Sequence, residues 1–327
     1  MPFRARTYRG TPRNLAFLAA RLRKGELVAV PTETVYGLAA DATSAAACRR
    51  IFAAKGRPRT DPLIVHIASL GYLARVAVPN PEALKLAKAF WPGALTLVLP
   101  KTKAIPGDAT AGLPSVAVRM PSHPLFRKLI RLAGVPLAAP SANPFGYVSP
   151  TTARHVEQGL GSRVRHILDG GPSRIGLEST IVDLRDPRRP VLLRPGAVTR
   201  AQLERVLGVR VRAAVAPAGA KSAQVAPGQL ERHYSPKTPV QLHARISAGA
   251  ASRKPDEAWL FVARPALKGA NIFWLDPKGN LKGAGRRLFA ILRKLDDAGF
   301  QRIHVELPKG AGMAEALGDR LRRAAAR

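Results

Sequence analysis

The sequence is short of cysteine, of acidic residues and of long apolar runs. Cys48 is the one cysteine among 327 residues, which excludes an internal disulfide and a zinc site built from several cysteines. No apolar run approaches the roughly 20 residues that a membrane-spanning helix needs. No apolar signal core follows the basic start "MPFRARTYRG". These absences predict a soluble protein of the cytoplasm that is not associated with a membrane.

Acidic residues are scarce relative to basic ones. The chain has 53 lysines and arginines against 21 aspartates and glutamates, a formal charge of +32. Such a charge attracts polyanions such as nucleic acid and nucleotides. The basic residues are spread along the whole chain, however, and aromatic residues make up only 6%. The charge is equally consistent with an arginine-rich composition whose charges are solvated, so it identifies no partner by itself.

What is present is an alternation of amphipathic and apolar segments. Residues 11–25 predict a helix with Thr11 as its N-cap, Pro12 in its first turn and Gly25 at its end. Two further helices are predicted at residues 43–56 and 80–91, and short strands at 27–31, 62–67, 94–100, 115–120, 136–140, 179–184 and 191–196. This mixture indicates an α/β domain. Because the last two strands follow one another closely, a mixed sheet fits better than a purely parallel one.

The composition divides the chain into two α/β regions. Residues 211–230 are rich in Ala, Gly and Pro and show no regular period, which is typical of a linker. A second alternation of strands and helices follows, from "AWLFVA" to "GMAEALGDRLRRAAAR". We therefore predict a larger α/β domain at residues 1–208, a linker at 209–238 and a smaller α/β domain at 239–327.

Cations stand directly before one of the predicted strands. In "KGRPRTDPLIVHI", Lys55, Arg57 and Arg59 lead into an apolar run that carries His66. Buried cations are costly unless an anion meets them, and arginine can bind two phosphate oxygens at once. We hypothesise that this anion is a ligand and not a neighbouring carboxylate. The alternatives are a solvated loop for the cations and a core position for the histidine.

Polar residues also stand at the ends of other predicted strands, where α/β folds place ligands. Arg119 ends an apolar strand, a position in which arginine needs a carboxylate or phosphate partner. The remaining residues of this kind are Thr32, Thr34 and Gly37, then Ser141, Asn143, Ser149, Thr151 and Thr152, then Ser179, Thr180 and Arg194. Turns and helix caps explain several of them individually: a turn and helix lead-in at 31–41, and capping at 149–152. Neither a P-loop nor a GxGxxG motif is present. Together they predict one pocket of cations and hydroxyls without a nucleophile–base pair, which suits phosphoryl or nucleotidyl transfer.

Several motifs occur in an order that is typical of a known family. They are "PTETVYGL", "KGRP", "PLIVHI", "VAVRMP", "APSAN" with "SPT", "GLESTIVDL" and "LRPG". In these motifs the sequence resembles the threonylcarbamoyl-AMP synthases, YrdC-like enzymes of tRNA modification. The resemblance covers residues 10–208, and "APGQLERHYSPKTP" and the segments after it resemble the linker and extra domain of the family's longer form. It implies a YrdC-like twisted mixed sheet with flanking helices, followed by a small Rossmann-like α/β domain.

The resemblance implies an enzyme, an L-threonylcarbamoyladenylate synthase, with L-threonine, bicarbonate or carbon dioxide, and ATP as substrates. The threonine amine becomes a carbamate, whose oxygen attacks the α-phosphate of ATP and displaces pyrophosphate. Mg²⁺ would accompany ATP, bound mainly by phosphate and water, and no organic cofactor is implied. A downstream threonylcarbamoyl-transferase complex would pass the group to the tRNA adenosine next to the anticodon. Weak binding of tRNA by this chain would be an addition to the activity.

The resemblance also assigns roles to individual residues. Lys55 and Arg57, the family's K-x-R pair, would stabilise the charge at the reacting phosphate. ATP would be bound by Arg57, Asp61, Ser115, Ser141, Asn143, Ser149, Arg194 and Tyr234. L-threonine would be bound by Thr34, His66, Arg119, Ser179 and the backbone of Ala139. No residue is assigned to Mg²⁺ or to bicarbonate.

The linker residue Tyr234 implies a lid. The expectation is that "ERHYSP" folds back over the pocket, with Arg232, His233 and Tyr234 shielding a labile mixed anhydride from water. Two other functions are weighed against the synthase. The carbamoyltransferase of hydrogenase maturation also contains a YrdC-like domain, but it needs zinc-finger cysteines that this chain lacks. An RNA-binding module of the same fold without catalysis is the main alternative, and it would ignore threonine and bind with a steep salt dependence.

Overall fold

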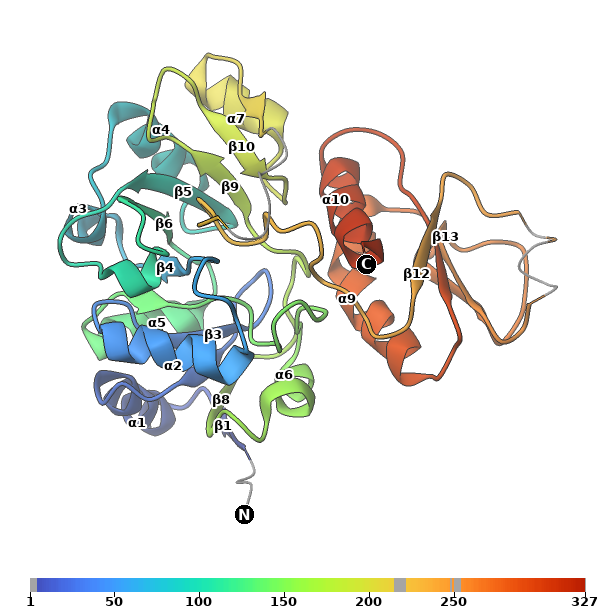
Figure 1. Cartoon of the computed structure of the whole chain (residues 1–327), viewed down its shortest axis with the longest axis horizontal. Coiled ribbons are helices and arrows are strands. Elements are labelled where there is room, and N and C mark those ends of the chain that lie inside the picture. Colours follow the sequence, from blue (N-terminus) through green and yellow to red (C-terminus); the bar gives the residue numbers. More distant parts are fainter. Residues whose placement is uncertain (1–4, 215–221, 248, 250–253, 327) are drawn as a thin grey trace.

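The computed structural model describes residues 5–214, 222–247, 249 and 254–326. Figure 1 shows two α/β bodies, of which the larger holds the first part of the chain and the smaller holds the last part. In the described part of the chain, no helix has the length and apolar character needed to cross a membrane.

One mixed sheet forms the larger body. Its strands, in their spatial order, are β1 (Arg6–Arg9), β8 (His166–Asp169), β2 (Val28–Val30), β3 (Gly37–Asp41), β7 (Leu137–Ala138), β4 (Ile64–His66), β6 (Ser115–Arg119), β5 (Leu95–Pro100), β9 (Thr180–Asp183), β10 (Val191–Arg194) and β11 (Arg212–Ala213). Strand β4 is parallel to β6 but antiparallel to β7, and β5 is antiparallel to β6. The predicted mixed sheet is confirmed.

The helices of the larger body are α1 (Pro12–Arg23), α2 (Ala45–Lys55), α3 (Leu73–Val76), α4 (Pro81–Phe90), α5 (Pro124–Ala133), α6 (Ala153–Leu160) and α7 (Arg200–Leu207), with 3-10 turns at Leu70–Tyr72 and Gly107–Ala109. Side-chain caps begin the α-helices of this body other than α3 and α5. The hydroxyl of Thr11 accepts a hydrogen bond from the Asn14 amide at 3.3 Å, and Asn80 caps α4 in the same way through the Ala83 amide at 2.8 Å. Both caps satisfy amides that the first helical turn leaves free.

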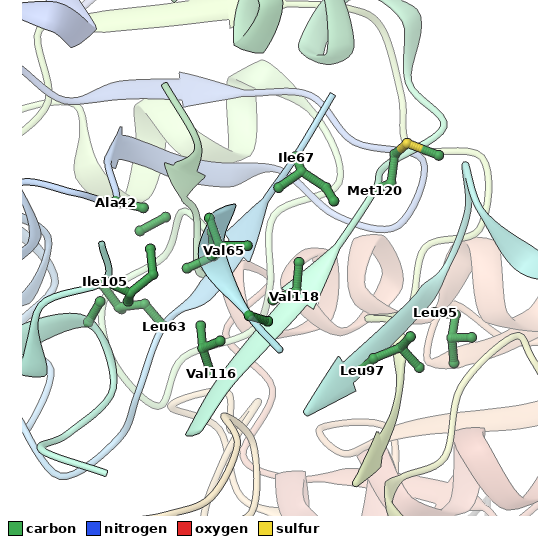
Figure 2. Packing of buried hydrophobic residues seen from close by; sticks show 14 of the residues in the cluster. Ala42, Leu63, Val65, Ile67, Leu95, Leu97, Ile105, Val116, Val118 and Met120 are labelled. Carbon is green, nitrogen blue, oxygen red and sulfur yellow. The ribbon is translucent and has the colours of Figure 1, made fainter. Parts of the chain in front are cut away.

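Apolar residues of the central strands fix the positions of the ends of β4 and β6, which carry His66 and Arg119. Val65 of β4, Val118 of β6 and Leu97 of β5 are all fully buried on neighbouring strands, as Figure 2 shows. Burying a side chain of this size contributes about 1.5–3 kcal/mol. The same packing holds His66 and Arg119 side by side, because these residues are paired in the register of β4 and β6.

The segment after β2 differs from the sequence-based prediction. A turn and the lead-in to a helix were expected around Gly37, but Gly37 begins β3 and pairs with Val30 of β2. A Cβ atom at Gly37 would lie only 3.2 Å from the Cβ of Ala139. The glycine therefore allows the segment after β7 to approach β3 closely, and the chain reverses before Gly37, between β2 and β3.

The smaller body is built on a second sheet. Its elements are β12 (Val240–His243), β15 (Ile303–Glu306), β13 (Ala258–Ala263) and β14 (Ile272–Asp276), in spatial order, with α9 (Leu281–Asp297) and α10 (Met313–Ala325). All its strand pairs are parallel. Helices α9 and α10 lie between this sheet and the larger body (Figure 1). The apolar cluster around these helices includes Val35, Val148 and Leu177 of the larger body, so both bodies share one buried interface.

Candidate active site

The ends of several strands meet the linker around one pocket. It is lined by Thr32, Thr34, Val35, Gly37, Arg57, Ile64, His66, Arg119, Ala139, Pro140, Ser141, Glu178, Ser179, Arg194, Pro227, Gly228, His233 and Tyr234. The lining includes these residues of the expected ATP side: Arg57, Ser141, Arg194 and Tyr234. It also includes all the residues of the expected threonine side: Thr34, His66, Arg119, Ala139 and Ser179. Segments far apart in the sequence thus converge on one cavity.

Five residues expected at the site do not line this pocket: Lys55, Asp61, Ser115, Asn143 and Ser149. Three of them contact residues that do. Lys55 donates to the carbonyl of Ser141, and the Ser149 hydroxyl donates to Glu178 Oε1 at 2.5 Å. Asp61 pairs with Arg57. These three residues therefore hold residues of the pocket lining in position without lining the pocket themselves.

Lys55 is the last residue of α2, and only 2% of it is exposed. Its Nζ donates to the carbonyl oxygens of Ser141 at 2.6 Å and Asn143 at 2.5 Å. Burial, and next the positive charge of Arg57, hold the pKa of Lys55 well below its ordinary value, although Asp61 opposes the shift. The lysine thus fixes the backbone that follows β7.

The anion that pairs with Arg57 is a carboxylate of the protein itself. Arg57 Nη2 lies 2.9 Å from the carboxylate of Asp61 and donates to the Pro62 carbonyl, and Arg57 Nε donates to the Asp61 carbonyl. The hypothesis that a ligand rather than a neighbouring carboxylate meets these cations is therefore wrong for Arg57. Burial raises the pKa of Asp61 in spite of nearby cations, and among the described residues no donor makes a well-aligned hydrogen bond to either of its carboxylate oxygens. Arg59, by contrast, is exposed, as the solvated-loop alternative holds for this residue.

Arg119 also has a carboxylate partner that the sequence analysis missed. Its Nη2 donates to Glu33 Oε1 at 2.6 Å, and its Nη1 donates to the Thr34 hydroxyl at 2.9 Å. Burial acts to raise the pKa of Glu33, but the charge and hydrogen bond of Arg119 outweigh it and hold that pKa below its ordinary value. The buried arginine is thus compensated within the fold, and the other Glu33 oxygen has no hydrogen-bond partner in the described residues.

His66 is a neutral polar group in the wall of the pocket. Burial, with a smaller effect of the Arg119 charge, lowers its pKa to about 3. Its Nδ1 lies 3.1 Å from the carbonyl oxygen of Ile64, to which a protonated Nδ1 donates. A histidine with so low a pKa stays uncharged at neutral pH, so it can hydrogen-bond a substrate but adds no positive charge to the site.

Arg194 connects the strands to the linker. Its Nε and Nη2 donate to the carbonyl and hydroxyl of Ser179, at 3.0 and 3.1 Å, and its Nη1 donates to the carbonyl of Pro227 at 3.3 Å. Gly228 follows with φ of +78°, and a Cβ there would lie 2.9 Å from the Tyr234 hydroxyl. The linker can therefore approach Arg194 and Tyr234 only with glycine at this position.

Residues 227–234 close one side of the pocket. Tyr234 is fully buried, its ring stacks on Phe289 of α9 at 5.5 Å between centroids, and its φ is +62°. The neighbouring His233 ring lies 4.1 Å away. The free space left inside is only about 40 Å³, far below the roughly 300–1,000 Å³ of ligand pockets. A nucleotide can therefore enter only if some part of the lining moves.

Glu178 and Arg320 are two further residues that sequence reasoning missed. Glu178 lines the pocket, and its Oε2 accepts from Arg320 Nε of α10 at 2.8 Å. The Arg320 guanidinium also lies 5.3 Å from the ring centre of Tyr234. Glu178 lies within the motif "GLESTIVDL", which is a sequence signal for it. Arg320 has no such signal, because its sequence context is that of an ordinary arginine on an amphipathic helix. The smaller body thus reaches the wall of the pocket.

Some buried polar atoms without partners belong to the pocket. In the described part of the chain, the Tyr234 hydroxyl and His233 Nδ1 are in its lining, whereas the Ser115 hydroxyl and Asn143 Oδ1 belong to residues outside the lining. Folded proteins pair nearly all such atoms, with protein, water or ligand. Together with Asp61, these groups indicate a site built to receive a polar ligand.

Comparisons with known proteins agree with this geometry. The Sua5/YciO/YrdC family model, described as "Telomere recombination", matches residues 20–196, and the model "Threonylcarbamoyl-AMP synthase, C-terminal domain" matches residues 198–326. The threonylcarbamoyl-AMP synthase of Pyrococcus abyssi is 43% identical over 317 residues, covering 94% of this chain and 92% of the relative. That of Bacillus subtilis is 49% identical over 231 residues, covering 70% and 66%.

A solved structure extends the similarity to the whole fold. The crystal structure of P. abyssi Sua5 complexed with L-threonine matches with a TM-score of 0.90 and 39% identity, over 98% of this chain and 96% of that one. Fold and pocket thus define a class, the YrdC-like nucleotidyltransferases that form an adenylate. The chain belongs to the threonylcarbamoyl-AMP synthase family, in its two-domain form, as the motifs indicated.

Proposed function

We propose that the chain joins L-threonine, bicarbonate or carbon dioxide, and ATP into threonylcarbamoyl-AMP and pyrophosphate, for the modification of tRNA next to the anticodon. The convergence of Arg57, Arg194 and Arg119 with serine and threonine hydroxyls on one pocket is the observation that carries this proposal. The relatives named threonylcarbamoyl-AMP synthase support it.

On the nucleotide side, Arg57 stabilises the negative charge that develops when a carbamate oxygen attacks the α-phosphate. Its pairing with Asp61 holds the guanidinium in place before the substrate arrives. Lys55 acts by fixing the backbone of Ser141 and Asn143, to whose carbonyl oxygens its Nζ donates in the closed pocket. The further proposed ATP contacts are Asp61, Ser115, Ser141, Asn143, Ser149, Arg194 and Tyr234.

On the threonine side, Arg119 binds the amino-acid carboxylate with the N–H groups that Glu33 and Thr34 leave free. A guanidinium has five donors, and three of those of Arg119 are directed to Glu33, Thr34 and the Gly93 carbonyl. His66, Ser179 and the backbone of Ala139 provide the other proposed contacts. The threonine complex of P. abyssi Sua5 supports an amino-acid site in this fold.

Residues 209–238 act as a linker whose segment around His233 and Tyr234 is the lid. The small free space of the pocket and the complete burial of Tyr234 support a closed conformation in which water has little access. The smaller domain, residues 239–327, holds this lid through Phe289 and Arg320. Replacing Tyr234 with Ala, or removing residues 209–327, should raise ATP turnover that yields no intermediate.

ATP would carry Mg²⁺ bound by its phosphate oxygens and by water, and the ion would supply positive charge for the pyrophosphate group. The carboxylates of Asp61 and Glu178 are already paired, with Arg57 and Arg320 respectively. This pairing is consistent with phosphate and water, and not these side chains, as the main ligands of Mg²⁺. Among the described residues no group of three or more His, Cys, Asp or Glu is placed to hold a metal ion. The product passes to a threonylcarbamoyl-transferase complex in the cytoplasm, and tRNA binding by this chain is weak.

The test is release of pyrophosphate from ATP with threonine and bicarbonate supplied together or singly. We expect turnover only when both are present, and a loss of about 100-fold or more for Arg57→Ala, since removing one preorganised charge contact costs about 10²–10³ in rate. Arg59→Ala is the matched control, because Arg59 is exposed two residues away. Equal turnover with serine, or turnover without threonine, would contradict the proposal.

A further inference from the structure

A second cleft is lined by residues of α6, in the larger body, and of α9, in the smaller body. It is lined by Arg154, His155, Gln158, Ala290, Arg293, Lys294, Asp297 and Ala298. The free space inside is about 430 Å³, which falls within the roughly 300–1,000 Å³ of small-ligand sites. The cleft shares no lining residue with the active-site pocket.

Positive charge converges on this cleft from both walls. Arg154 belongs to α6, whereas Arg293 and Lys294 belong to α9, and Asp297 is the acidic residue of the lining. Within residues 5–214, 222–247, 249 and 254–326, neither Arg154 nor Lys294 takes part in an ion pair. Lys294 Nζ lies 5.6 Å from the ring centre of Phe273, a contact that leaves its N–H donors free. The cleft therefore has an excess of cations over acids.

Arg293 is buried, with 5% of the residue exposed, and its hydrogen bonds are incomplete. Its Nη2 donates to the carbonyl of Val148, and its guanidinium lies 4.8 Å from the ring centre of Tyr147. Its Nε is buried and has no acceptor in the described residues. The nearby Asp296 carboxylate instead accepts from the Tyr147 hydroxyl and the Thr238 amide. A buried cation with an unused donor favours an anionic ligand.

His155 adds a neutral donor to the same cleft. Its Nδ1 accepts from the Thr151 amide at 3.3 Å, which places the proton of the neutral ring on Nε2. Burial, then the charges of Arg293 and Arg154, lower the pKa of His155 to about 4. Both arginines therefore act on the same imidazole, and that ring is uncharged at neutral pH.

We propose that this cleft binds a phosphate group, supplied either by a free inorganic anion or by an RNA backbone. Arg154, Arg293 and Lys294 provide charge and N–H donors, and His155 provides Nε2–H, while phosphate oxygens accept from all four. The site is linked to the active-site pocket. Arg293 holds the carbonyl of Val148, and the next residue, Ser149, donates to Glu178 of the pocket wall.

The pKa of His155 is a local readout for this proposal. It is followed by NMR in the full-length protein, with the resonance assigned through His155→Gln. One anion close to the ring should raise that pKa by about 1 unit. Inorganic phosphate and a short single-stranded RNA without terminal phosphates are added separately, each against sodium chloride of equal ionic strength to correct for screening.

The variant Arg154→Gln/Lys294→Gln should abolish the ligand-dependent rise, because it removes two cations of the cleft from exposed positions. Lys282→Gln, an exposed position elsewhere on α9, is the matched control and should leave the rise unchanged. A rise with phosphate identifies the free anion as a ligand, and a rise with RNA alone identifies the backbone. No rise beyond that of sodium chloride, or an undiminished rise in the double variant, would overturn the proposal.

Discussion

Arg320 of α10 and Glu178 of the pocket wall form an ion pair with 2.8 Å between Nε and Oε2, and their side chains are only 0% and 8% exposed. The other Glu178 oxygen accepts from Ser149, and the same guanidinium lies against Tyr234. One arginine of the smaller domain thus positions a pocket carboxylate and the lid tyrosine together. Because Arg320 itself does not line the pocket, it acts through these two residues.

Replacing Arg320 with Met should lower both stability and catalytic coupling. Loss of one partner from a buried pair costs about 3–5 kcal/mol, and the released lid should raise the KM for ATP and the fraction of pyrophosphate released without threonylcarbamoyl-AMP. Arg320→Lys retains the charge and should recover stability more fully than coupling. Arg322→Gln, exposed on the same helix, is the control. Unchanged product per pyrophosphate in Arg320→Met would refute the positioning role.

Replacing Tyr234 with Phe should separate binding from folding. The Tyr234 hydroxyl is buried without a partner in the described residues, so its removal relieves a desolvation penalty of about 1–3 kcal/mol. We expect an equal or higher Tm together with a higher KM for ATP, since the hydroxyl is available for the nucleotide. A lower Tm with an unchanged KM for ATP would mean that the hydroxyl stabilises the folded protein and does not contact the nucleotide.

Replacing Glu33 with Gln should destabilise the protein in a pH-dependent way. The pKa of Glu33 is depressed in the folded state, so its pairing with Arg119 stabilises above the ordinary value of 4.5 and is lost as the pH falls through the folded pKa. The difference in unfolding free energy between wild type and Glu33→Gln should be constant from pH 7 to 5 and shrink in stronger acid. Urea melts at several pH values measure it. A constant difference throughout would exclude the charge as the cause.

Replacing His66 with Gln should reduce the loss of stability in mild acid. The folded pKa of about 3 lies below the ordinary 6.5, so the unfolded chain binds a proton first and stability falls as the pH drops below 6.5. This histidine should contribute about 1.4 kcal/mol per pH unit in that window, or about 2 kcal/mol between pH 6.5 and 5. The slope of unfolding free energy against pH for the variant checks this value, and an unaltered slope would show that His66 is protonated in the fold.

The sequence was sufficient where a single segment determines the structure. The predicted cap at Thr11 depends on a residue three positions away, and it is observed. The order of the strands was not accessible in the same way, because β1 pairs with β8 from a segment near residue 166. Such pairing depends on the packing of the whole sheet, which no local pattern encodes.

The pocket shows the same division between local and long-range information. Arg119 and His66 were noticeable because polar residues interrupt apolar strands, and both line the pocket. The carboxylate partners of Arg119 and Arg57 were not noticeable in the sequence. Glu33, the partner of Arg119, lies among hydroxyl residues, and Asp61, the partner of Arg57, was expected to contact the ligand. Arg320 carries no local signal, because only the docking of the two bodies brings it to Glu178.

Helices α9 and α10 lie between the outer parallel sheet and the larger body, and they supply Phe289, Arg293 and Arg320 to the shared interface. The outer strands can therefore influence catalysis by shifting these two helices. Grafting a different parallel sheet beneath unchanged α9 and α10 faces should consequently preserve turnover, and it marks the strand layer as the place where the protein tolerates redesign.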